Sequence, residues 1–494
     1  MKILKKNKGL KLWVLVIGLF SVTNLCLADE PVWGPDVRLT YALKESYEPA
    51  ITSDANGIHI VWYDWRDGNA EIYYKRSQDG GNTWGPDVRL TYDSSLSGNP
   101  AITSDAHGLH IVWHDYRDGN WEIYYKRSQD GGDTWGPDVR LTYDPSYSQY
   151  PAITSDAYGI HIVWEDWRDS EIYYKRSQDG GDTWGPDVRL TNASRLSWHP
   201  AAITSDAHGI HIVWMDYRDG NWEIYYKRSQ DGGNTWGPDV RLTNDPSYSH
   251  YPAITSNAHG IHIVWYDERD RNSEIYYKRS QDGGNTWGPD VQLTDNSAGS
   301  WWPAITSDAH GIHIVWVDYR DGNYEIYYKR SQDGGNIWGA DVRLTYDSGW
   351  SDHPAIISDA NGIHIVWHDT RDGNAEIYYK RGTFSPSFAI DIILNQDTFT
   401  TGDTARIDVR VDNPGSATTV DAKVCIKLPT GDYISLINMY NITIPAGGIG
   451  PLNLLTYTFT GSEPAGLYEV LGRLLHPITG DHLTTDIETF TFTP

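Results

Sequence analysis

Cysteine is nearly absent from this sequence, which holds only two such residues among 494. They are Cys26 and Cys425, and Cys26 lies in an N-terminal stretch that we expect to be removed from the mature chain. With a single cysteine left, no internal disulfide can form, so packing must stabilise the folded chain. Methionine and phenylalanine are also scarce, with 3 and 7 residues, whereas 23 tryptophans and 34 tyrosines provide ample apolar mass for a core.

Long apolar runs are missing as well, except at the start of the chain. Residues 1–28 combine a lysine-rich beginning, an apolar segment over 12–27 and a small final residue, Ala28. This pattern predicts a secretory signal peptide, so we expect a secreted or cell-surface protein. Two alternatives are an uncleaved membrane anchor, which the short and interrupted run disfavours, and a lipid anchor on Cys26, which the bulky Leu25 disfavours. No later segment is apolar enough to cross a bilayer, so we expect no membrane insertion after cleavage.

Basic residues are outnumbered, because 40 Lys and Arg face 66 Asp and Glu, giving a formal net charge of −26. Without residues 1–28, which contain five lysines and no acidic residue, the charge becomes −31. Phosphate backbones and anionic lipid surfaces repel such a chain. We therefore expect neither nucleic acid nor a membrane surface as a partner.

An internal repeat of about fifty residues dominates the sequence instead. Between copies of the segment W-G-(P/A)-D-V-(R/Q)-L-T lies a longer phrase, which first reads PAITSDANGIHIVWYDWRDGNAEIYYKRS. Each unit predicts four short strands separated by Gly, Asp and Asn turns, and four strands per repeat are typical of a β-propeller blade. The seven copies of the W-G segment begin at Trp33, Trp84, Trp135, Trp184, Trp236, Trp287 and Trp338.

The two ends of the repeat array are complementary. The last copy ends at Gly382 without its fourth-strand segment, whereas residues 33–40 supply one such segment before the first full unit. We therefore predict an all-β fold with a seven-bladed propeller over residues 29–382, closed by pairing of the N-terminal strand with the last blade. Closure removes the sheet edges that an open solenoid would expose, and we expect a monomer.

Beyond the repeats, the composition changes. Residues 383–387 are predicted to form a linker. The alternating apolar and polar residues of 388–494, broken by turn signals, predict an immunoglobulin-like β-sandwich.

The turn before every W-G segment except the first carries the motif S-x-D-x-G-x-T-W, once with Ile337 in place of Thr. This motif resembles the Asp box of the sialidase-like, or BNR-repeat, propeller superfamily, where it is a structural turn between the third and fourth strands. An Asp carboxylate accepts turn N–H bonds and Gly permits positive φ, so we expect the same role here. The motif aspartates are Asp79, Asp130, Asp179, Asp231, Asp282 and Asp333. The motif lacks the dense oxygen ligands of a calcium site, and we predict neither a metal nor a cofactor.

Strand alternation places two sets of loops on the face opposite the Asp boxes, which we call the variable face. They are the turns between second and third strands and the connections from each fourth strand to the next blade, which change freely from repeat to repeat. Aromatic rings beside polar loop groups suit sugar binding, whereas the alternative is unselected variation with aromatics packed locally. Eight tryptophans map to this face: Trp65, Trp121, Trp167, Trp198, Trp222, Trp301, Trp302 and Trp350.

The same face carries a D-x-R-D element in every blade. Either its arginines form ion pairs that fix the turn, or some of them hold a ligand carboxylate bidentately. The resemblance implies the second role, because sialidases grip the carboxylate of sialic acid with three arginines. The arginines are Arg66, Arg117, Arg168, Arg218, Arg269, Arg320 and Arg371.

Catalytic residues of the sialidase type cannot be assigned to this sequence. The Phe/Tyr-Arg-Ile-Pro segment that carries one family arginine is absent. Glu165 and Glu268 break the repeat pattern and Tyr47 lies in a connection, but none of them matches a catalytic motif. We therefore predict a secreted binding propeller for a glycan or a cell-surface partner. The alternative is a sialidase-like glycoside hydrolase.

Overall fold

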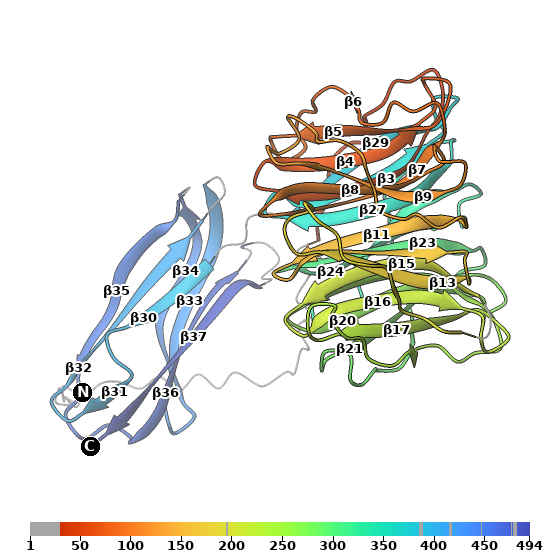
Figure 1. The fold of residues 1–494 in the computed structure, drawn as a ribbon. Coiled ribbons are helices and arrows are strands. Elements are labelled where there is room, and N and C mark those ends of the chain that lie inside the picture. Colours follow the sequence, from red (N-terminus) through yellow and green to blue (C-terminus); the bar gives the residue numbers. More distant parts are fainter. Residues whose placement is uncertain are drawn as a thin grey trace, which may run out of the picture. The chain divides into compact units, whose positions relative to one another are not determined.

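The computed structural model describes residues 30–193, 196–384, 389–413, 417–445, 447–475, 477 and 482–494, except for the side chains of residues 199–201 and 482. The predicted signal peptide and most of the predicted linker lie outside these ranges. The chain divides into two compact units, the larger of which is Trp33–Thr383 (Figure 1). Among the described residues, no helix has the length and apolar character that a membrane span requires.

The larger unit is a propeller of seven antiparallel sheets, as the repeats predict. The first strands of the blades are β3 (Ser46–Asp54), β7 (Ser97–Asp105), β11 (Ser148–Asp156), β15 (Ser197–Asp206), β19 (Ser249–Asn257), β23 (Ser300–Asp308) and β27 (Ser351–Asp359). The second strands are β4 (Gly57–Asp64), β8 (Gly108–Asp115), β12 (Gly159–Asp166), β16 (Gly209–Asp216), β20 (Gly260–Asp267), β24 (Gly311–Asp318) and β28 (Gly362–Asp369). The third strands are β5 (Glu71–Ser77), β9 (Glu122–Ser128), β13 (Glu171–Ser177), β17 (Glu223–Ser229), β21 (Glu274–Ser280), β25 (Glu325–Ser331) and β29 (Glu376–Thr383).

The fourth strands are much shorter than the eight-residue W-G segment suggests. The start of this segment follows the third strand through a single bond, such as Gly85 N–H to the Arg76 carbonyl at 2.9 Å, and the sixth blade does the same with Ala340 in place of proline. The fourth strands are β6 (Val88–Arg89), β10 (Val139–Arg140), β14 (Val188–Arg189), β18 (Val240–Arg241), β22 (Val291–Gln292) and β26 (Val342–Arg343).

The seventh blade is completed by the N-terminus of the chain, which confirms the predicted closure. Strands β1 (Val32–Trp33) and β2 (Val37–Arg38) both pair with β29, with Val37 opposite Tyr379. The ion pair between Arg371 and Asp36, at 2.8 Å, joins the two ends of the repeat array. Lys75 of the first blade donates to the Leu39 carbonyl at 2.6 Å, so the closing strand also contacts the next blade.

Each blade buries its second strand between neighbouring sheets. In β4, Ile60, Val61 and Trp62 are fully buried. His59 is also buried, with the Tyr74 hydroxyl 2.7 Å from its Nδ1 atom and an Asp54 oxygen 2.9 Å from its Nε2 atom. The equivalent imidazoles of the other six blades make the same two contacts, once with an asparagine in place of the aspartate. They are satisfied core groups.

The C-terminal residues form two sheets, in the strand orders β30-β32-β35 and β31-β37-β36-β33-β34. Buried residues from both sheets, among them Ile407 and Val424, share one apolar core, so the module is a β-sandwich. Its assignment to the immunoglobulin-like class stays a prediction. The strands are β30 (Ala389–Leu394), β31 (Thr398–Thr400), β32 (Thr404–Asp412), β33 (Thr418–Lys427), β34 (Tyr433–Ile444), β35 (Ile449–Thr458), β36 (Gly466–Leu475) and β37 (His482–Thr493).

Candidate functional site

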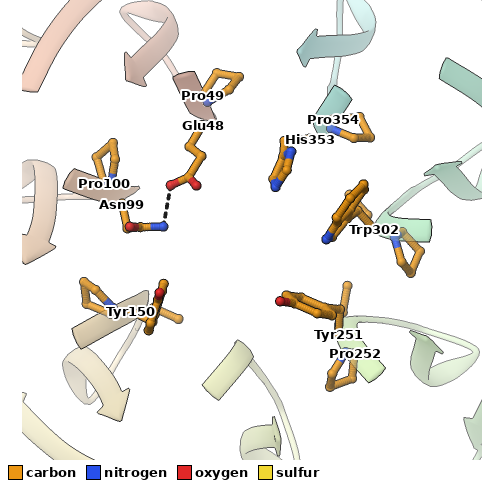
Figure 2. Close-up of a pocket in the computed structure, with 15 residues that line it drawn as sticks. Glu48, Pro49, Asn99, Pro100, Tyr150, Tyr251, Pro252, Trp302, His353 and Pro354 are labelled. Carbon is orange, nitrogen blue, oxygen red and sulfur yellow. Dashed lines mark hydrogen bonds between the residues drawn. The ribbon is translucent and has the colours of Figure 1, made fainter. Parts of the chain in front are cut away.

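The first strands contact one another in a closed circle around the propeller axis, and a cavity of about 490 Å³ opens among them. Figure 2 shows one side chain from each of six blades directed into this cavity. In each of these blades, the next residue in the chain is a proline that also lines the cavity. The equivalent residue of the fourth blade is His199, whose side chain lies outside the described part. We call the six the channel residues: Glu48, Asn99, Tyr150, Tyr251, Trp302 and His353.

A β-bulge turns the channel residues toward the axis. Strands β3 and β4 pair regularly at Tyr47 and again from Ala50 onward, so Glu48 and Pro49 stand outside the ladder. Glu48 has a φ of 49°, and the other channel residues have φ between 47° and 51°. In this left-handed region a non-glycine residue costs on the order of 1–3 kcal/mol, and bulky residues are rare there. Such residues at a strained position point to a role for their side chains.

Two further variable positions in each blade adjoin the channel residues. One precedes the channel residue on the first strand, and the other is its partner on the second strand. The rest of these strands is nearly the same in all blades, so the variation is concentrated around the cavity. The pairs are Tyr47 and Tyr63, Gly98 and His114, Gln149 and Glu165, Trp198 and Met215, His250 and Tyr266, Trp301 and Val317, and Asp352 and His368.

A continuous row of five rings begins in the cavity lining with Trp302 and His353 and continues behind it. Trp302 stacks on His353 with ring centroids 4.7 Å apart, and His353 stacks on His368 at 5.1 Å. His368 meets Tyr47 edge to face at 5.1 Å, and Tyr47 lies 5.7 Å from Tyr63. Flat aromatic faces of this kind suit the C–H faces of sugar rings, while the tyrosine hydroxyls remain available as hydrogen-bonding groups.

Charged groups lie beside this row. The Asn99 amide donates a hydrogen bond to the Glu48 carboxylate (Figure 2). Burial raises the pKa of Glu48, and the favourable contacts with His353 and Asn99 only partly oppose this effect. Burial disfavours the charged form of His353, yet the hydrogen bond to Asp352 and the charges of Asp352 and Glu48 outweigh burial and raise its pKa. The cavity lining therefore places the His353 imidazole and the Glu48 carboxyl group close to each other.

Other imidazoles at the variable positions are neutral. Burial lowers the pKa of His114 to about 3 and that of His250 to about 4. Burial, helped by the nearby charge of His353, lowers the pKa of His368 to about 4. These rings contribute packing surface and lone pairs rather than positive charge.

The structure brings one of the eight candidate tryptophans into the cavity lining. Trp302 is a channel residue, and the neighbouring Trp301 ring lies 6.4 Å from it. Trp198 and Trp222 stack on each other at 5.7 Å, which is local packing of the kind described as the alternative. A binding role for the tryptophans outside the lining stays a prediction. These are Trp65, Trp121, Trp167, Trp198, Trp222, Trp301 and Trp350.

The D-x-R-D arginines are held by aspartates of their own blades. Arg117 donates to Asp115 at 2.9 and 2.7 Å and to Asp138 at 2.7 Å, and its guanidinium lies 4.4 Å from the ring centroid of Tyr124. A ligand carboxylate would have to displace these aspartates, and a ligand role for the arginines stays a prediction. The Nη2 bond to the first aspartate and the contact with the tyrosine recur at Arg66, Arg168, Arg218, Arg269, Arg320 and Arg371.

The Asp boxes form compact turns. Asp79 accepts hydrogen bonds from the Thr83 hydroxyl at 2.6 Å and the Thr83 N–H at 2.8 Å, and these bonds lower its pKa to about 2. Gly81 has a φ of 87°, and a Cβ atom there would lie 1.9 Å from the Tyr379 hydroxyl of the adjoining blade. The turns therefore contribute to blade-to-blade packing. Hydrogen bonds from a threonine hydroxyl and a threonine N–H recur at Asp130, Asp179, Asp231 and Asp282. Of these two bonds, Asp333 accepts only the one from the backbone N–H, which Ile337 donates.

The sequence analysis missed five of the six channel residues, because it selected side chains by type rather than by position. Tyr47, predicted to lie in a connection, and Glu165, a break in the repeat pattern, both adjoin the channel residues, whereas Glu268 lies in a turn, 4.0 Å from His250. The available signal was the residue before each Pro-Ala, which reads Glu, Asn, Tyr, His, Tyr, Trp and His in otherwise matching repeats. No arginine belongs to the cavity lining among the described residues, so the arginine triad implied by the resemblance is not assembled there.

Comparison with known families agrees with this architecture. Two overlapping stretches, residues 65–315 and 163–361, match the family described as BNR repeat-like domain, and together they cover more than half of the chain. The chain belongs to the BNR repeat-like family. This membership confirms the resemblance that the Asp boxes indicate.

Solved structures similar to this BNR repeat-like chain include two sialidases and a lyase. NanB sialidase from Streptococcus pneumoniae is 11% identical over 71% of this chain and 70% of its own, with a TM-score of 0.42. Trypanosoma rangeli sialidase is 11% identical over 92% and 88%, with a TM-score of 0.41. The polysaccharide lyase Uly1 is 10% identical over 72% and 98%, with a TM-score of 0.48. Comparison with curated proteins gave no match.

Proposed function

We propose that this BNR repeat-like chain is an exported binding protein that takes a glycan into the channel cavity. The observation that carries the proposal is the convergence of the variable positions of the first and second strands on one cavity, while the rest of these strands hardly changes. If loop drift alone caused the variation, it would not be concentrated at strained, inward-facing residues.

The chemistry of the wall fits a sugar. The cavity volume of about 490 Å³ lies within the range of small-ligand sites. Tyr150, Tyr251 and Trp302 supply aromatic faces, while Glu48 and Asn99 supply hydrogen-bonding groups for hydroxyls. A sugar needs both kinds of contact, because its ring has apolar C–H faces and a polar edge.

A glycan array followed by calorimetry on purified residues 29–494 tests this proposal. We expect a saturable glycan ligand whose affinity falls at least about tenfold in Trp302→Ala and Tyr251→Ala, since truncation of a central aromatic contact costs upwards of about 1–2 kcal/mol. Trp350→Ala is the matched control, because Trp350 is 57% exposed and lies outside the cavity lining. Equal losses in the control and the channel variants, or no glycan ligand at all, would refute the proposal.

A glycoside hydrolase of sialidase type is the second candidate. One observation favours it: the carboxyl group of Glu48 lines the cavity, and its charge, together with burial, raises the pKa of Tyr63. Catalysis by this pair predicts turnover of a fluorogenic sialoside that Glu48→Gln abolishes. Such turnover would replace the binding proposal, whereas saturable binding without turnover supports it.

A further inference from the structure

Three potential metal ligands meet in the seventh blade, and one of them, His353, lines the cavity. Asp352 and His353 lie on β27, and His368 lies on β28 directly opposite Asp352 in the ladder. One ligand atom from each of the three lies within 4.8 Å of the other two. The His353 Nδ1 atom is 3.1 Å from an Asp352 carboxylate oxygen.

His368 is unlike the core imidazoles of the propeller. It is only 8% exposed, and its Nδ1 atom has no hydrogen-bond partner among the described residues. In the same strand, His364 is fully buried with the Tyr379 hydroxyl 2.8 Å and an Asp359 oxygen 2.9 Å from its two nitrogens. An unpaired polar atom is costly to bury, so the blade provides a ligand atom that a bound cation would satisfy.

This combination occurs once in the repeat array. The same three positions hold Gly98, Asn99 and His114 in the second blade, and no other repeat has an aspartate and two histidines there. The scaffold of the blade does not require these residues, since the other repeats fold without them. Their joint presence in one blade is a local feature.

The donor set selects the class of metal. Two imidazoles and one carboxylate are typical of Zn²⁺ and neighbouring transition metals, whereas Ca²⁺ and Mg²⁺ prefer oxygen ligands. Around a tetrahedral ion with bonds of about 2.1 Å, the ligand atoms lie about 3.4 Å apart. Side-chain rotations that move the ligand atoms by about 1 Å would therefore bring them to the distances that an ion requires. Asp352, and Glu48 from the adjoining blade, supply negative charge to balance the dication.

We propose that Asp352, His353 and His368 bind a divalent transition metal ion of the Zn²⁺ class in the wall of the channel. With three protein ligands the ion keeps a coordination position for water or for a ligand oxygen. The site lies beside the glycan cavity, but it does not depend on the proposed function, because the ion can be measured without any glycan.

Cobalt is the direct probe of this site. The untagged chain, treated with a chelator and titrated with Co²⁺, is expected to develop the visible absorption of a nitrogen- and oxygen-ligated ion with one ion bound per chain, and Zn²⁺ should displace it. His368→Gln and Asp352→Asn should each weaken binding at least about tenfold, in line with loss of one ligand from a small set. Zn²⁺ should also raise the thermal midpoint of the unmodified chain but not of His368→Gln.

The matched control is His114→Gln, at the second-blade position that corresponds to His368. It should bind Co²⁺ as the unmodified chain does. Absence of the absorption in the unmodified chain would overturn the proposal. So would unchanged binding in both His368→Gln and Asp352→Asn, because the ion would then lie elsewhere, for example at exposed imidazoles such as His107. Circular dichroism of each variant separates loss of the site from loss of the fold.

Discussion

Replacing Thr40 by valine tests closure of the ring at a single buried hydroxyl. Thr40 and Glu376 are both fully buried, and the Thr40 hydroxyl donates to a Glu376 carboxylate oxygen while it accepts the Ile377 N–H at 2.8 Å. Valine fills the same space, so the cost is that of the two bonds rather than of a cavity. A bond to a charged group contributes about 1.5–3 kcal/mol and a neutral one about 0.5–1.5 kcal/mol, so the free energy of unfolding should fall by about 2–4 kcal/mol.

The second blade supplies the control. The Thr142 hydroxyl donates to Glu122 and accepts the Ile123 N–H at 2.8 Å, in the same arrangement within one continuous repeat. Urea unfolding followed by tryptophan fluorescence should therefore show similar losses for Thr40→Val and Thr142→Val. If Thr142→Val is destabilising and Thr40→Val is neutral, the N-terminal strand is not docked in solution and the closed ring is wrong.

Two further predictions concern the Asp box and the D-x-R-D element. The folded pKa of Asp79 is about 2, below the ordinary 3.8, so its stabilising effect is complete above about pH 4 and is lost as the pH falls toward 2. Carboxyl NMR titration should show that Thr83→Val raises the pKa of Asp79. Asp333, which lies beside Ile337 and lacks the hydroxyl bond, should have a higher pKa than Asp79 in the unmodified chain. Equal pKa values for the aspartates of all boxes would contradict this account. Arg117→Lys should lower the free energy of unfolding by about 2–4 kcal/mol, because lysine cannot replace the forked contacts, and should leave glycan affinity unchanged. Lost affinity at normal stability would instead place the ligand at the arginines.

The architecture was predictable because the number of blades follows from the number of repeat segments in the sequence. Seven copies of each segment, with one displaced to the N-terminus, define the blades and their closure without any knowledge of side-chain contacts. The lengths of individual strands were less predictable. The W-G segment was expected to form a full strand, yet only two residues of it, such as Val88 and Arg89, pair regularly.

The site was predictable only to the level of a face. The variable connections lead into the first strands that carry the channel residues, but tryptophan content favoured residues such as Trp350, which lies outside the cavity lining. The positions of Glu48 and His353 depend on a bulge, where the two-residue alternation of side chains fails. A bulge is defined by pairing between strands, and so a single strand sequence does not reveal where its side chains are directed.

The closing strand also dictates when the propeller can be completed. Thr40 and Glu376 are separated by 336 positions in the chain. The first strand of the propeller to be synthesised therefore cannot pair until nearly the whole repeat array has followed it. Until then both halves of the seventh sheet present unpaired backbone to the surroundings. A chain truncated anywhere before β29 keeps that vulnerability permanently. Such a fragment exposes a sheet edge on which another chain can pair, whereas the finished array covers that edge with its own N-terminal strand.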